Sequence, residues 1–134
     1  MIGNLLRALL IVPALLAAAL GGAYAFDKVG FPSRDARELV GWLARPPGAG
    51  PFPVVIGLHG CAGLYTRSGE ISARETDWSQ RLVRAGYAVL LVDSFGPRGI
   101  RALCNERDRA LTPADRARDA FAALDWLARQ SFAV

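Results

Sequence analysis

Two uninterrupted apolar segments constrain the fold of this chain more than any other feature. They are VVIGL at residues 54–58 and YAVLLV at residues 87–92. Segments without polar alternation are buried on both faces, as the strands of a parallel sheet are. We therefore expect two parallel strands, joined by a right-handed crossover.

The segment between these strands, RETDWSQRLVRAG at residues 74–86, is predicted to form the crossover helix. Trp78, Leu82 and Ala85 share one helical face, which we expect to be buried. Gly86 is suited to the C-terminal end of the helix. Strand, helix and strand in this order are typical of an α/β fold.

A second helix is predicted after the second strand. Thr112 is expected to cap it, Pro113 suits its first position, and Asp115 lies near the positive end of the helix dipole. We expect its apolar stripe to be buried and its charged residues, Asp119 among them, to point elsewhere. The stripe consists of Ala117, Ala120, Phe121, Leu124 and Leu127.

Two shorter segments precede the parallel strands. FDKVGFPS at residues 26–33 and ELVGWLARP at residues 38–46 are separated by the polar residues Arg34 and Asp35. This pattern predicts two strands in a β-hairpin. The next segment, RPPGAGP at residues 45–51, is predicted to be a Pro/Gly turn.

The N-terminus has the layout of a secretory signal peptide. A short segment carrying Arg7 precedes an apolar run at residues 8–20, and a small-x-small cleavage site ends at Ala25. The alternative is an uncleaved membrane anchor, for which the run is short, because a spanning helix needs about 20 residues. We expect residues 1–25 to be removed, leaving residues 26–134 as one exported domain, periplasmic or secreted, without a stable membrane partner.

The charge pattern argues against a nucleic-acid partner. The net charge is +4, Lys28 is the single lysine, and the arginines are spread among acidic residues. A surface that binds nucleic acid carries a denser basic patch. One histidine and two cysteines do not make a zinc site of the usual kind. We expect neither a metal nor an organic cofactor.

The first apolar strand ends in a glycine-rich loop, HGCAG at residues 59–63. In an open α/β sheet, sites form beyond the carboxyl ends of parallel strands. Glycines let the backbone turn sharply there, and backbone N–H groups can hold the oxyanion of an acyl-transfer intermediate. An ordinary tight turn is the alternative, and this loop alone leaves both open.

Three segments in this order and spacing resemble the dienelactone hydrolase family of α/β-hydrolases: VGFPSRDARELVGWLARPP, PFPVVIGLHGCAGLY and RLVRAGYAVLLVDSFGPRG. The resemblance extends over about residues 28–130, and HGCAG and DSFGPRG are its most specific parts. It implies an α/β-hydrolase fold, a mostly parallel sheet with flanking helices. It also implies that the intact enzyme hydrolyses a small carboxylic ester or lactone through an acyl-enzyme.

The resemblance assigns an oxyanion loop to His59, Gly60, Cys61, Ala62 and Gly63. The backbone N–H of Cys61 is the implied donor, so its side chain has no part in that role. Members of the family that act on dienelactone have a glutamate at about the position of Gly60. Its absence here favours a general carboxylic ester hydrolase.

The resemblance also places the loop after the second parallel strand beside the substrate pocket. Ser94, Phe95 and Arg98 are the pocket candidates in this loop. Arg98 lies where dienelactone hydrolases have an arginine near the substrate carboxylate. A surface arginine that closes a turn is the alternative.

Hydrolases of this type use a nucleophile on a G-x-S-x-G or G-x-C-x-G elbow, followed by an acid and a histidine. The chain has no such elbow, and Ser94 in VDSFG lacks the leading glycine. Its single histidine, His59, is assigned to the oxyanion loop. We therefore expect the N-terminal half of such a fold, truncated before the nucleophile elbow. The nucleophile, acid and catalytic histidine are expected beyond Val134, and the chain alone is expected to be inactive.

The cysteines have two interpretations. In an oxidising compartment, Cys61 and Cys104 are expected to form a disulfide. The alternative is a reactive thiol at Cys61, whose only histidine is the adjacent His59. A thiol redox protein is disfavoured, since the two cysteines are far apart in sequence, unlike C-x-x-C.

Two other functions remain open from the sequence. A peptidase or another acyl hydrolase on the same fold would use the same oxyanion loop. A non-catalytic exported binding or structural module would explain the missing elbow without truncation.

Overall fold

The computed structural model describes residues 24–107 and 110–134. The predicted signal peptide lies almost entirely outside these residues, so its cleavage stays a prediction. No helix in the described part of the chain is long and apolar enough to cross a membrane. The elements are β1 (Asp27–Pro32), β2 (Glu38–Ala44), β3 (Val54–Leu58), α1 (Ala73–Arg84), β4 (Ala88–Asp93), the 3₁₀ turn η1 (Gly96–Arg98) and α2 (Pro113–Leu127).

The four strands form one mixed sheet in the order β1-β2-β4-β3. β1 and β2 pair antiparallel, with Asp27 opposite Leu43, and β2 also pairs antiparallel with β4. β3 and β4 pair in parallel, with Val54 opposite Ala88. The predicted hairpin and the predicted parallel pair are both confirmed.

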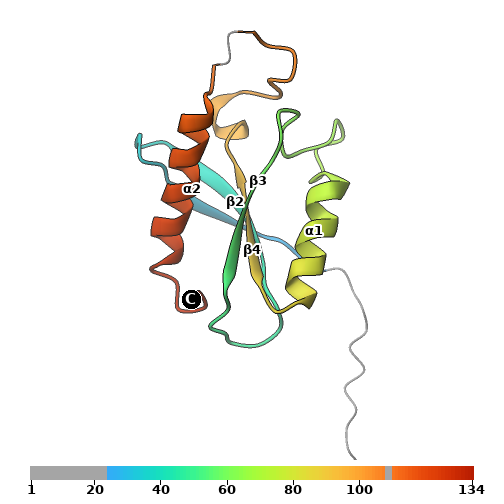
Figure 1. Cartoon of the computed structure of the whole chain (residues 1–134), viewed down its shortest axis with the longest axis vertical. Helices are drawn as coiled ribbons and strands as arrows, with labels where there is room; N and C mark the ends of the chain where they lie inside the picture. Colours follow the sequence, from blue (N-terminus) through green and yellow to red (C-terminus); the bar gives the residue numbers. More distant parts are fainter. Residues whose placement is uncertain (1–23, 108–109) are drawn as a thin grey trace, which may run out of the picture.

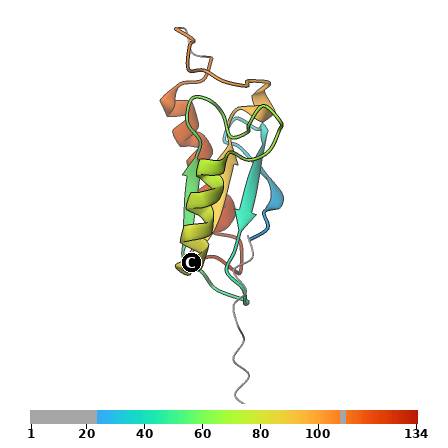
Figure 2. The same cartoon turned by 90° about the vertical axis from the view of Figure 1, so that its right-hand side faces the viewer.

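The two helices cover opposite faces of the sheet, so the domain has three layers (Figures 1 and 2). β4 lies between β2 and β3, and all six of its residues are buried. Its side chains alternate: Leu90 and Val92 pack with α2, whereas Val89 and Leu91 pack on the α1 side. This strand is buried on both faces, which explains its uninterrupted apolar sequence.

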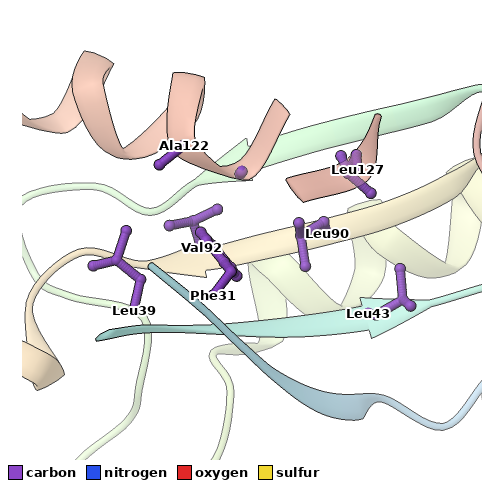
Figure 3. Packing of buried hydrophobic residues seen from close by; sticks show 8 residues of the cluster. Phe31, Leu39, Leu43, Leu90, Val92, Ala122 and Leu127 are labelled. Carbon is purple, nitrogen blue, oxygen red and sulfur yellow. The ribbon is translucent and has the colours of Figure 1, made fainter. Parts of the chain in front are cut away.

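The larger hydrophobic core lies between α2 and the sheet (Figure 3). The rings of Phe31 and Trp126 lie 5.8 Å apart and connect β1 to α2. Small side chains on the helix permit close packing against the sheet. The cluster consists of Phe31, Leu39, Leu43, Leu90, Val92, Ala122, Ala123 and Leu127.

The predicted buried stripe of α2 is largely wrong. Phe121 and Leu124 are 53% and 52% exposed. The helix turns another face inward because the carboxylate of Asp119 is bound by the guanidinium of Arg98, and a paired charge can be buried. The residues of α2 that are buried are Asp119, Ala122, Ala123 and Leu127.

The predicted face of α1 also needs correction. Trp78 is 62% exposed, and Val83 is buried instead. Ser79 and Glu75 are buried beside Val83, and the polar groups of both side chains have hydrogen-bond partners. The hydroxyl of Ser79 donates to the carbonyl of Glu75 at 2.7 Å, and the Glu75 carboxylate accepts from Arg74 at 2.6 Å.

Candidate active site

The carboxyl ends of β3 and β4 lie at the same end of the sheet, because the two strands are parallel neighbours. The loop at residues 59–63 follows β3, and the loop at residues 94–112 follows β4 and leads into α2 (Figure 1). The two segments that the sequence singles out are therefore side by side in the fold.

His59 connects these two loops. Its side chain is buried, with an exposure of 2%. Nδ1 lies 2.9 Å from the carbonyl oxygen of Gly60, to which it donates. Nε2 accepts the backbone N–H of Ser94 at 3.3 Å. Burial lowers the pKa of His59 and so favours the neutral imidazole, and the two hydrogen bonds place the proton of that form on Nδ1.

The glycine at the end of the HGCAG loop is required by geometry. Gly63 has φ = 88°, and its N–H donates to the carbonyl of Gly60 at 3.2 Å. A Cβ atom at position 63 would lie 2.6 Å from the carbonyl oxygen of Arg101, closer than any side chain allows. The turn therefore lies directly against the loop that follows β4.

The turn leaves backbone donors available. Within the described residues, the N–H groups of Cys61 and Ala62 donate to no protein acceptor. The carbonyl of Cys61 is used, since it accepts the N–H of Leu103 at 2.8 Å. Free N–H groups at the carboxyl end of a parallel strand are suited to hold a developing negative charge on oxygen.

The structure joins Cys61 and Cys104 in a disulfide with a Cα–Cα distance of 4.9 Å. The bond links the HGCAG loop to the loop between β4 and α2. With both sulfurs bonded to each other, the structure contains no thiol at Cys61, and the reactive-thiol alternative loses its basis. The predicted pairing agrees with the structure.

A pocket of about 350 Å³ lies beside this disulfide. Its walls come from the end of β3, the loop after β4 and the first turns of α2. Most of the lining is apolar, and a guanidinium is its single charged group. The lining residues are Leu58, Cys61, Phe95, Leu103, Leu111, Pro113, Arg116 and Ala117.

Of the three predicted pocket residues, Phe95 reaches this pocket. Its ring is 2% exposed and meets the His59 ring edge-on, at 4.4 Å between centroids. Ser94 is not part of the pocket lining and has zero exposure, and its Oγ has no hydrogen-bond partner among the described residues. A hydroxyl buried in this way is not accessible as a nucleophile.

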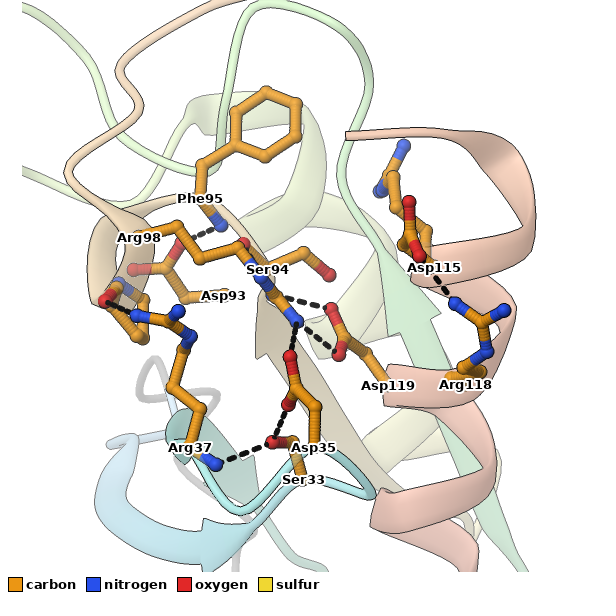
Figure 4. A network of polar contacts seen from close by, with 12 residues as sticks. Ser33, Asp35, Arg37, Asp93, Ser94, Phe95, Arg98, Asp115, Arg118 and Asp119 are labelled. Carbon is orange, nitrogen blue, oxygen red and sulfur yellow. Dashed lines mark hydrogen bonds and ion pairs between the residues drawn. The ribbon is translucent and has the colours of Figure 1, made fainter. Parts of the chain in front are cut away.

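The guanidinium of Arg98 is occupied by intramolecular contacts (Figure 4). Its guanidinium donates two parallel hydrogen bonds of 2.8 Å to the carboxylate of Asp119 and one of 2.7 Å to the carbonyl of Ser94. Arg98 therefore closes the turn after β4, as in the alternative interpretation, but its side chain is only 10% exposed. Its charge is already compensated, and Arg98 is not among the residues that line the pocket.

Asp93 organises the turn after β4. Its carboxylate accepts the backbone N–H groups of Phe95 and Gly96, at 3.0 and 2.8 Å. The same carboxylate lies 3.9 Å from Nε2 of His59. Asp93, Ser94 and His59 are thus close together, yet the histidine bonds to the backbone of Ser94 and not to its hydroxyl.

The sequence interpretation missed Arg116. It lies in the first turns of α2 and is one of the charged residues that the helical periodicity predicts to point away from the core. Its Nη2 donates to the carbonyl of His59, and its guanidinium lies 5.5 Å from the centre of the Phe95 ring. Only the packing of α2 against the loop after β3 reveals this contact.

Gly60 faces an ion pair. A Cβ atom at this position would lie 3.3 Å from Nη2 of Arg74, which is paired with the largely buried carboxylate of Glu75. The loop itself has no carboxylate at position 60. The carboxylate of Glu75 lies on α1, and Arg74 compensates its charge. Within residues 24–107 and 110–134, no group of three His, Cys, Asp or Glu side chains is placed to hold a metal ion.

Comparison with solved structures identifies the fold. Esterase Est22 is 19% identical, with a TM-score of 0.58 over 84% of this chain and 32% of that chain. A Klebsiella pneumoniae protein assigned as a dienelactone hydrolase is 20% identical, with a TM-score of 0.58 over 82% of this chain and 46% of the other. Dipeptidyl peptidase 4 of Porphyromonas gingivalis is 19% identical, with a TM-score of 0.60 over 84% and 16%.

These neighbours are hydrolases, and the chain has part of an α/β-hydrolase fold, as predicted from the sequence. It spans 32% of the length of Est22. The resemblance to an esterase and to a dienelactone hydrolase agrees with the predicted family at the level of the fold. No protein-family profile matches the chain, and neither does any curated protein.

Proposed function

We propose that this chain is part of an exported hydrolase of the dienelactone hydrolase type, which cleaves carboxylic esters or lactones. The observation that carries the proposal is the HGCAG loop at the end of β3. The N–H groups of Cys61 and Ala62 have no acceptor among the described residues, and Cys61 lines an apolar pocket. An apolar pocket with few convergent polar groups suits a small ester.

In the proposed reaction, the N–H of Cys61 donates to the carbonyl oxygen of the ester as it becomes an oxyanion. A donor in this position is worth about 10²–10³ in kcat in other acyl hydrolases. The nucleophile, acid and catalytic histidine belong to sequence beyond Val134 under this proposal. The 134-residue chain is then inactive, and His59 positions the oxyanion loop without transferring protons.

Export is supported by two independent features. The first 25 residues have the pattern of a signal peptide, and the Cys61–Cys104 disulfide suits an oxidising compartment. Neither feature depends on the assignment of the ester hydrolase.

A peptidase is the second candidate. Its support is the likeness to dipeptidyl peptidase 4, with a TM-score of 0.60. Amide and ester hydrolysis use the same kind of oxyanion site. The oxyanion loop therefore does not distinguish an ester hydrolase from a peptidase. A substrate assay is needed to distinguish them.

The test is to sequence the gene beyond the codon for Val134 and to express any longer reading frame beside the 134-residue chain. Both products are assayed with p-nitrophenyl acetate and with a dipeptidyl p-nitroanilide. We expect a G-x-S-x-G or G-x-C-x-G elbow soon after Val134 and ester hydrolysis by the longer product alone. Anilide cleavage without ester cleavage would favour the peptidase. A stop codon with no elbow in any frame would favour a non-catalytic module.

A further inference from the structure

The pocket beside the disulfide contains a cation that has no carboxylate partner. Arg116 lines this pocket, and no Asp or Glu of the described residues lies within ion-pair distance of it. One nitrogen, Nη2, donates to the carbonyl of His59. Nε is buried and has no hydrogen-bond partner among the described residues.

Arg98, in the turn after β4, does have a carboxylate partner. Arg98 places its guanidinium against the carboxylate of Asp119, with two hydrogen bonds of 2.8 Å. Arg116 is three residues before Asp119 on α2, yet that carboxylate is already bound. Burial lowers the pKa of Arg116, and the nearby carboxylate of Asp119 opposes this lowering only in part.

A partly buried guanidinium that has no carboxylate partner among the described residues is stabilised when an anion joins it. Carboxylates suit this group well, because two oxygens can accept from its planar array of donors. The remaining walls of the pocket are apolar and include Phe95, Leu103 and Leu111. They would exclude a strongly hydrated anion and accept a hydrocarbon body.

We propose that this pocket is a binding site for a small organic acid, with its carboxylate on Arg116 and its apolar part between Phe95, Leu103 and Leu111. Cys61, whose N–H has no acceptor among the described residues, is also part of the pocket lining. Under the proposed function, such an acid is what ester hydrolysis releases, and only this role rests on the proposed function.

The experiment uses two probes of equal shape, phenylacetate and phenylacetamide, titrated into the 134-residue chain by calorimetry. We expect the acid to bind about ten-fold more tightly than the amide or better, because hydrogen bonds to a charged group contribute about 1.5–3 kcal/mol. Amide resonances of Cys61 and Leu103 should shift with the acid. Equal binding of both probes would overturn the proposal.

Variants locate the charge that is responsible. In Arg116→Gln the preference for the acid should disappear, although glutamine can still donate to the carbonyl of His59. Arg116→Lys keeps a charge and should keep a weaker preference. Arg118→Gln is the matched control, since Arg118 is exposed and pairs with Asp115. A preference that persists in Arg116→Gln, or is lost in Arg118→Gln, contradicts the assignment.

Inorganic phosphate tests whether the site recognises charge alone. We expect phosphate to compete poorly, because it has no apolar part to fill the pocket. Displacement of phenylacetate by phosphate at equal concentration would overturn the organic-acid assignment. All of these measurements involve binding without turnover. Their failure therefore leaves the ester-hydrolase proposal standing, and inactivity of a longer reading frame leaves the binding site standing.

Discussion

Arg98 and Asp119 form a bidentate ion pair that joins the turn after β4 to the middle of α2, with both hydrogen bonds at 2.8 Å. The side chains are 10% and 2% exposed. Replacing Asp119 by Asn leaves the largely buried Arg98 with only the more distant and exposed carboxylate of Asp35, at 3.9 Å. We expect the free energy of unfolding to fall by about 3–5 kcal/mol, measured by urea denaturation.

The matched control for this pair is Asp125→Asn. Asp125 also pairs with an arginine, Arg34, at 2.9 Å, but both side chains are more than half exposed. An exposed pair contributes about 0–1 kcal/mol. Equal effects of the two substitutions would show that the buried pair is not special.

Thr112 caps α2 through a reciprocal pair of bonds. Its hydroxyl accepts the N–H of Asp115 at 3.2 Å, and its own N–H donates to the Asp115 carboxylate at 2.9 Å. Thr112→Ala removes one of these bonds and should lower the free energy of unfolding by about 1 kcal/mol. Thr112→Ser keeps the hydroxyl and should change little. An unchanged free energy of unfolding in Thr112→Ala would mean that tertiary packing alone stabilises the start of the helix.

The disulfide is expected to stabilise the domain as well as the loop. It closes a segment with a sequence separation of 43. On the chain-entropy model, this constraint is worth about 4 kcal/mol. Thiol titration of unreduced, denatured protein should find no free thiol, and reduction should lower the thermal unfolding temperature. Two free thiols in the unreduced protein would contradict the pairing of Cys61 with Cys104.

His59 gives the folding free energy a pH dependence. Burial holds its pKa below the ordinary value of 6.5. The unfolded chain therefore binds more protons than the folded one below pH 6.5. The stability is complete above that pH and is lost as the pH falls towards the lowered pKa of the folded state.

The pH dependence is tested by urea denaturation of the wild type and of His59→Gln across the acid range. Asp93 and Glu75 oppose the lowering of the His59 pKa, and Arg116 adds to it. We expect the difference in stability between the two proteins to shrink as the pH falls below 6.5. A difference that stays constant with pH would show that His59 is not desolvated in the folded state.

The outer edge of β3 should make the 134-residue chain associate. Only the start of this edge is paired in the described residues, where Phe52 donates to the carbonyl of Phe132 at 2.7 Å. Unpaired apolar edges recruit other strands. Leu58→Lys places a charge at this edge, where the side chain is already 41% exposed, and should reduce association in sedimentation experiments. Phe121→Lys, on the exposed face of α2, is the control. A wild type that sediments as a monomer at every concentration would contradict this prediction.

The sequence by itself determined the order of the elements and the place of the candidate site. Uninterrupted apolar runs predicted that 54–58 and 87–92 are parallel strands buried on both faces. The parallel pairing is confirmed, but only β4 is fully buried, whereas β3 lies at the edge of the described sheet and Leu58 is 41% exposed. The local signals at Thr112 and at HGCAG act over a few residues, and the structure has a helix cap at Thr112 and a turn at HGCAG. The sequence favoured the pairing of Cys61 with Cys104 on the expectation of an oxidising compartment, and left a reactive thiol at Cys61 open until the structure joined the two sulfurs.

Tertiary structure decided which helical faces are buried and which arginines are compensated. The periodicity of α2 favoured burial of Phe121 and Leu124, yet the helix turns Asp119 inward, because Arg98 compensates its charge. That partner is 21 residues away in sequence. The sequence pattern predicts that Arg116 is solvated, whereas in the fold its guanidinium contacts the carbonyl of His59, directly after β3. Long-range pairing of charges depends on distances that a sequence does not contain, and this is why the acid-binding pocket had to be found in the fold.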